Sequence, residues 1–182
     1  TMMDRHVGEI TALLKKLGIY QNTLMFFTSD NGAAKRFDGI HNSSGVMQGK
    51  KRSLNEGGIR VPMVVRWPSK IKAGRVSSHP WYFPDVMPTF AEIGGVSTEV
   101  PEDIDGISIL PTLLDKGVQK QHEYMFWQYG VRAVRSGKWK GIGKGGHLYL
   151  YDLSEDIEEK NDLSSNHPKI AARMKKYITI GY

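Results

Sequence analysis

The chain has 182 residues, enough for one domain or for one domain and part of a second. Apolar residues make up 40% and charged residues 24% of the sequence, a balance that allows a hydrophobic core and argues against wholesale disorder. Cysteine is absent, which excludes disulfides, thiolate metal sites and a cysteine nucleophile within these residues. The net charge of +6 is scattered along the chain, so we expect attraction of anionic substrates rather than nucleic-acid binding. The sequence contains no run of 18 apolar residues, so it predicts no membrane-spanning helix.

The first predicted elements are a helix and a buried strand. Residues 3–17 favour a helix because apolar side chains recur at spacings of three and four, at Met3, Val7, Ile10, Leu14 and Leu17. The continuous apolar run 24–27 is typical of a strand buried on both faces of a parallel sheet. A helix followed by such a strand indicates an α/β domain, in which sites lie beyond the carboxyl ends of the strands.

A long polar stretch, 32–58, follows this strand. Loops of that length inside compact domains are usually functional or disordered. The next predicted elements are a strand at 61–67, a helix at 85–93 that Asp85 could cap, and a short element at 105–114.

The character of the sequence changes near residues 116–121. Four short strands are expected at 124–128, 131–135, 138–142 and 148–151, with glycine turns between them. Pro168 is expected to open a last helix. We therefore predict an α/β part at 1–118 and a small antiparallel sheet with a terminal helix at 119–182.

The most informative pattern lies at the end of the first strand. Asp30 and Asn31 offer only oxygen ligands, which suit Ca²⁺ or Mg²⁺ better than zinc. The alternative interpretation is a simple Asp-Asn-Gly turn. A metal would need further ligands from elsewhere.

A second pattern follows at 49–62. Lys51 stands five residues before Glu56-Gly57-Gly58, which we interpret as a rigid turn whose glycines adopt positive φ and which aims the lysine back at the metal. A hard cation beside a fixed positive charge makes a site for a tetrahedral oxyanion ester.

These motifs resemble those of the type I sulfatases, of the arylsulfatase and N-acetylhexosamine-6-sulfatase kind, in the alkaline phosphatase superfamily. The resemblance runs from about residue 4 to residue 177. The segments that carry it are 22–32, 49–62, 88–89, 105–108, 134–140 and 150–153. It implies the C-terminal part of an alkaline-phosphatase-like α/β sandwich, followed by the small antiparallel sheet and helix.

By this resemblance, Asp30 and Asn31 correspond to two metal ligands, usually for calcium, and Lys51 to the lysine that contacts the sulfate. The family's nucleophile is a formylglycine made from a Cys/Ser-x-Pro-x-Arg motif, which this sequence lacks. We therefore expect the missing N-terminal half of the protein to supply it, and we expect the chain alone to be inactive.

Several further expectations follow. His41 lies in the polar stretch and is a candidate contact to the substrate. The expected substrate is a sulfated small molecule or glycan, and the resemblance suggests a periplasmic or extracellular location. The alternatives are a phosphoester or phosphonate hydrolase of the same superfamily, a non-catalytic carbohydrate-binding module and, more distantly, a nucleic-acid binder. Strand aromatics could form a sugar-stacking face or simply pack the sheet: Trp127, Tyr129, Trp139, Tyr149 and Tyr151.

Overall fold

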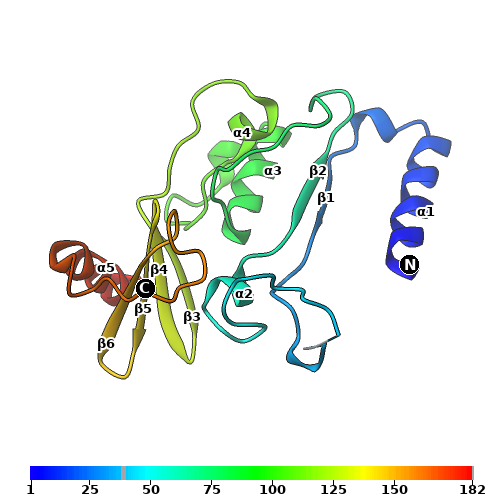
Figure 1. The fold of residues 1–182 in the computed structure, drawn as a ribbon. Coiled ribbons are helices and arrows are strands. Elements are labelled where there is room, and N and C mark those ends of the chain that lie inside the picture. Colours follow the sequence, from blue (N-terminus) through cyan, green and yellow to red (C-terminus); the bar gives the residue numbers. More distant parts are fainter. Residues whose placement is uncertain (38–39, 182) are drawn as a thin grey trace. The chain divides into compact units, whose positions relative to one another are not determined.

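The computed structural model describes residues 1–37 and 40–181 (Figure 1). The chain forms two compact units. The first unit contains residues 1–28 and 63–121, and the second contains residues 29–62 and 122–182. The second unit thus joins the long polar stretch after the first strand to the C-terminal sheet. The boundary predicted between residues 118 and 119 stays a prediction.

The first unit mixes helices with one small sheet. Its main elements are α1 (Met2–Lys16), β1 (Met25–Thr28), β2 (Met63–Arg66), α3 (Val86–Gly94) and α4 (Leu110–Leu114). Short 3-10 helices occur at Tyr20–Asn22, Phe83–Asp85 and Ser97–Glu99. These elements correspond closely to the segments predicted from the sequence, and the α/β class is confirmed.

The pairing of the first strand corrects one prediction. β1 pairs with β2 in antiparallel register, with Met25 opposite Arg66 and Thr28 opposite Met63. Phe27 is 38% exposed, so β1 is not buried on both faces. A parallel neighbour requires a crossover that carries the chain back to its starting edge. In the described residues between β1 and β2, the helices are short, and β2 simply runs back along β1.

Asp85 also differs from its predicted role. It precedes α3, but its side chain does not cap that helix. The buried carboxylate accepts hydrogen bonds from the backbone N–H groups of Tyr82, at 3.0 Å, and Ile107, at 2.8 Å. Buried backbone donors need such partners. Asp85 therefore connects the backbone just before α3 to Ile107, which lies 22 residues after Asp85 in the chain.

The apolar face predicted for the first helix is formed but is not covered. No residue of α1 is buried, and Met3, Ile10 and Leu17 are more than half exposed. On α3, Met87 and Phe90 are similarly exposed. Among the described residues, no helix is long and apolar enough to cross a membrane.

The second unit is built on a four-stranded antiparallel sheet. Its strands are β3 (Met125–Tyr129), β4 (Val131–Ser136), β5 (Trp139–Lys144) and β6 (His147–Asp152), in that order. The terminal helix α5 (Pro168–Ile180) packs against the sheet, as Figure 1 shows. Meander and helix agree with the sequence prediction.

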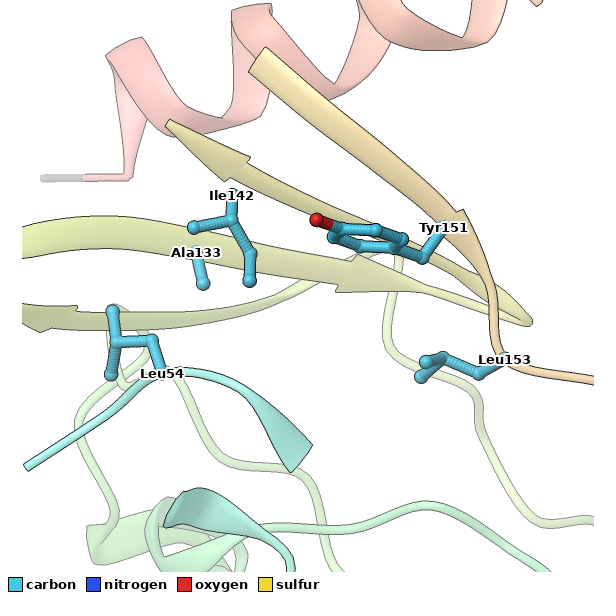
Figure 2. Close-up of a cluster of buried hydrophobic side chains, with 5 residues drawn as sticks. All are labelled: Leu54, Ala133, Ile142, Tyr151 and Leu153. Carbon is cyan, nitrogen blue, oxygen red and sulfur yellow. The ribbon is translucent and has the colours of Figure 1, made fainter. Parts of the chain in front are cut away.

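The two faces of this sheet bury different partners. On one face, Val134 and Leu150 pack against Met174 and Tyr177 of α5. The other face holds a cluster of Leu54, Ala133, Ile142, Tyr151 and Leu153 (Figure 2). Leu54 comes from the polar stretch, three residues after Lys51. Burying such a leucine contributes about 1.5–3 kcal/mol, so this contact anchors the lysine segment to the sheet.

The environment of Tyr151 gives a testable titration. Burial, together with the nearby Glu159 carboxylate, raises the pKa of its hydroxyl to about 12. Because the folded-state pKa lies above the unfolded value of about 10, the stability that this group contributes is complete below pH 10 and is lost as the pH rises through about 12. We expect alkaline titration followed by tyrosinate absorbance to show one fewer group ionising near pH 12 in Tyr151→Phe. A group lost near pH 10 instead would contradict this.

Candidate active site

The backbone brings the two sequence motifs together within the second unit. The Gly32 N–H donates to the Gly58 carbonyl at 2.9 Å, and the Lys51 N–H donates to the Ala33 carbonyl at 2.9 Å. These bonds connect the residues directly after Asp30 and Asn31 with the segment that carries Lys51. Two motifs separated by about 20 residues thus form one local structure.

Close approach of neighbouring backbone atoms explains why three positions of these motifs require glycine. A Cβ atom on Gly32 would lie 1.9 Å from the Gly57 carbonyl oxygen. On Gly57 it would lie 2.4 Å from the Gly49 oxygen, and on Gly58 it would lie 2.1 Å from the Ser53 oxygen. Since no side chain fits at these distances, the two motifs can approach only through glycine.

This geometry corrects the predicted role of Gly57 and Gly58. They are not at positive φ but belong to a single helical turn, α2 (Glu56–Ile59). The positive φ values of this segment occur instead at Gly49 (80°) and Arg52 (76°). A left-handed conformation at a residue other than glycine costs about 1 kcal/mol and is enriched at functional sites. Arg52 directly follows Lys51, and nothing in the sequence marked it.

The predicted ligands are placed at the surface of the second unit. Asp30 and Lys51 are exposed, and Asn31 is half-buried. The Ser29 hydroxyl donates to the Asn31 carbonyl at 2.9 Å, which leaves the Asn31 side chain out of that turn contact. The carboxylate and amide oxygens fit a hard cation in donor type. Within residues 1–37 and 40–181, no group of three or more His, Cys, Asp or Glu side chains could hold a metal.

A buried cluster of three charged side chains stabilises the segment that carries Lys51. Lys140 of β5 places its Nζ atom 2.8 Å from Glu56 Oε1 and 2.9 Å from Glu159 Oε1. Glu56 and Glu159 are each 2% exposed and Lys140 is 0% exposed, so the three are among the most buried residues of the unit. Lys140 also donates a hydrogen bond to Glu56 Oε1, whereas its contact with Glu159 Oε1 is an ion pair. Buried charges are tolerated when they are paired in this way.

Glu159 also holds the backbone of the same segment. Its Oε2 atom accepts the Glu56 N–H at 2.7 Å, and its carbonyl accepts from Gln48 Nε2 at 3.0 Å. Arg60 adds a longer contact to Glu56, at 3.6 Å. Both ends of the segment that carries Lys51 are therefore fixed by residues of the C-terminal sheet and its loops. No sequence pattern indicated Lys140 or Glu159, because Glu56, which both contact, lies more than 80 residues away from each.

His41 lines a hollow of about 480 Å³ in the same unit. The residues around it are small and polar apart from a few apolar side chains: Ala33, Ala34, Ile40, His41, Asn42, Ser43, Ser44, Gly45, Met47 and Lys50. The Ser44 hydroxyl is buried without a hydrogen-bond partner among the described residues. Lys50, not Lys51, contributes the lysine of this hollow.

The strand aromatics mostly pack the sheet. Tyr151 is buried, and Trp127 and Tyr149 pack against the same cluster. Trp139 packs on the opposite face, where its ring lies 4.9 Å from that of His167. Tyr129 is 55% exposed. A continuous sugar-stacking face is therefore not formed by these residues.

Comparison with known proteins identifies relatives of the chain. The pattern that defines the Sulfatase family matches residues 1–96. Mouse steryl-sulfatase is 40% identical over 153 residues, which cover 77% of this chain and 24% of that protein. The N-acetylgalactosamine-6-O-sulfatase of Bacteroides thetaiotaomicron is 31% identical and covers 97% of this chain and 39% of its own length.

A solved structure shows the same fold. The crystal structure of Ps i-CgsB in complex with k-i-k-neocarrahexaose superimposes with a TM-score of 0.81 at 32% identity. The alignment covers 97% of this chain and 40% of that one. The chain thus spans between about a quarter and two fifths of the length of the relatives that it matches.

Proposed function

Because the chain belongs to the sulfatase family, we propose that it is the part of a sulfuric ester hydrolase that forms one wall of the active site. The observation that carries this proposal is the pair of backbone hydrogen bonds that joins the Asp30-Asn31-Gly32 turn to the Lys51 segment. An exposed carboxylate, an amide and a lysine then belong to one rigid surface. Such a surface is suited to an anionic ester.

Asp30 and Asn31 would hold a calcium ion, or magnesium, together with ligands from outside this chain. Their carboxylate and amide oxygens are the donors that hard cations prefer. When bound, the ion would supply positive charge to the sulfate oxygens. The described residues offer no complete ligand set, so the site needs a second wall.

Lys51 would contact the sulfate group directly. During cleavage of the S–O bond, negative charge increases on the sulfate oxygens and on the leaving oxygen, and a pre-positioned lysine stabilises that charge without reorganisation. The Glu56–Lys140–Glu159 cluster and the close-packed glycines fix the backbone on either side of Lys51. His41 and the hollow beside it would receive the part of the substrate that carries the sulfate.

The second wall would come from an N-terminal half of the parent protein, which would also carry the formylglycine nucleophile. The exposed apolar faces of α1 and α3 in the first unit support this, since contiguous apolar surface usually marks an interaction site. The substrate would be a sulfated saccharide or aryl sulfate. Relatives named as N-acetylgalactosamine-6-sulfatases, and the related structure with bound neocarrahexaose, favour a saccharide.

The test is hydrolysis of an aryl sulfate by the parent protein, expressed from its full gene. Lys51→Ala is expected to lower kcat/KM by about 10²–10³-fold, because one group that stabilises developing charge is lost. Lys35→Ala, an exposed lysine of the same polar stretch, is the matched control and should retain activity. The purified 182-residue chain should show negligible turnover. Activity of the chain alone, or equal effects of the two substitutions, would overturn the proposal.

A further inference from the structure

A second hollow lies in the C-terminal unit, away from the residues assigned above. It measures about 370 Å³ and is lined by the ends of two β-hairpins and the second half of α5. Figure 1 shows where these elements lie along the ribbon. Its walls are Gly130, Val131, Arg132, Gly143, Lys144, Gly145, Gly146, His147, Leu148, Lys175, Ile178 and Thr179. None of the residues proposed for the sulfate site takes part.

The charge of this hollow has one sign. Arg132, Lys144 and Lys175 line it, and among the residues that the structure describes none of those that line it is acidic. Asp162 places its Oδ2 atom 2.9 Å from Nε2 of His147, one of the lining residues, and so engages that ring. Lys144 and Lys175 are exposed there, and these two lysines, with Arg132 beside them, favour the approach of an anion.

The walls are held in place by the fold. Arg132 donates from Nη1 to the Ile178 carbonyl at 3.2 Å, which fixes the strand side of the hollow to α5. Gly145 and Gly146 form the two-residue turn between β5 and β6, with φ values of 58° and 81°. Such a turn requires left-handed residues and leaves the hairpin tip without side chains. The opening of the hollow is therefore unobstructed on that side.

The floor of the hollow is apolar. Val131, Leu148 and Ile178 are half-buried there, beneath the basic rim. Saccharide-sized ligands present both features at once, since the C–H faces of a sugar ring contact apolar side chains while its anionic substituents reach the cations. A few convergent charged groups over an apolar base are typical of a small-ligand site.

We propose that this hollow is an accessory binding site for an anionic saccharide, which engages a sulfate or carboxylate substituent through Arg132, Lys144 and Lys175. The proposal deepens the proposed function, because it assigns the same polyanionic substrate class to a second place on the chain. A nucleic acid fits less well. Its phosphates repeat along an extended backbone, whereas these cations line one small hollow of about 370 Å³.

The test is an NMR titration of the 182-residue chain with a sulfated disaccharide and, separately, with its desulfated counterpart. The sulfated ligand is expected to shift the amide signals of residues 143–147 and 175–179, and the desulfated ligand should not. Lys144→Gln/Lys175→Gln is expected to weaken binding by about tenfold, as two charge-assisted contacts are lost. Lys169→Gln/Lys176→Gln is the matched control, because both exposed lysines lie on α5, outside the hollow, and the net charge changes equally.

The proposal would be overturned by equal weakening of binding in the control pair or by shifts confined to other residues. It would also be overturned if an oligonucleotide bound more tightly than the saccharide at the same salt concentration. Inorganic sulfate serves as a further arm, and binding as tight as that of the disaccharide would likewise contradict a saccharide site. The titration is repeated in Lys51→Ala, where binding at the hollow should persist. This experiment distinguishes failure of the proposal for the sulfate site from failure of the proposal for this hollow.

Discussion

Replacing Lys140 with methionine is expected to lower the free energy of unfolding of the chain by about 3–5 kcal/mol. Lys140 is fully buried and lies within 3 Å of two carboxylates, from Glu56 and Glu159. Without the lysine, the two buried carboxylates lose the cation that they share, and Glu56 keeps its longer contact to Arg60. Methionine fills a similar volume, so the loss measures charge rather than packing. Urea denaturation followed by circular dichroism gives the value.

Two further variants test the cause of this loss. Lys144→Met, in the exposed last position of the same strand, should change stability by less than about 1 kcal/mol. Combining Lys140→Met with Glu56→Gln and Glu159→Gln removes all three charges and should restore most of the stability, because a buried ion cluster is often no more stable than its neutral replacement. Equal destabilisation by the single and the triple variant would show that the charges are not responsible.

Gly32→Ala is expected to separate the two motifs of the candidate site. The new Cβ atom would lie 1.9 Å from the Gly57 carbonyl oxygen, a backbone atom that cannot move without displacing α2. Overpacking of this kind costs typically 1–3 kcal/mol, and a clash with backbone falls at the upper end. We therefore expect a loss of about 3 kcal/mol, together with large shifts of the backbone NMR signals of residues 49–58.

The control for this substitution is Gly8→Ala. Gly8 lies within α1, and an added Cβ there would meet no atom within 4 Å. Alanine is favoured over glycine inside a helix by about 1 kcal/mol, so this variant should be slightly more stable. If Gly32→Ala were as well tolerated as Gly8→Ala, the close approach of the two motifs would not be the feature that holds the site together.

Most elements of the fold could be predicted because they depend on local patterns. The helix at α1, the four strands of the C-terminal sheet and the helix opened by Pro168 follow from periodicity and turn residues, which are properties of neighbouring residues. Strand pairing is not local. β1 looked like a strand of a parallel sheet because its apolar run is continuous, but its antiparallel partner β2 depends on how the intervening chain returns.

In the candidate site, too, local features could be predicted from the sequence and long-range contacts could not. The motifs around Asp30 and Lys51 are short and carry their own signal, and the structure joins them by backbone hydrogen bonds. Their support could not be predicted, because Lys140 on a short strand has the appearance of a solvent-facing residue and Glu159 lies in an acidic loop. The glycines at 57 and 58 were recognised as special for the wrong reason. They are required by contact distance, which a sequence does not reveal, and not by φ.

The most direct test of the shared site is a double-mutant cycle on kcat/KM for a sulfate ester, measured in the parent protein with Asp30→Ala and Lys51→Ala. If Lys51 and the cation that Asp30 would hold stabilise the same developing charge, the double variant should lose far less than the product of the two single losses, since residues that act as a unit are strongly non-additive. Single losses that simply multiply, or a single variant with unchanged kcat/KM, would contradict a common oxyanion site formed by these two motifs.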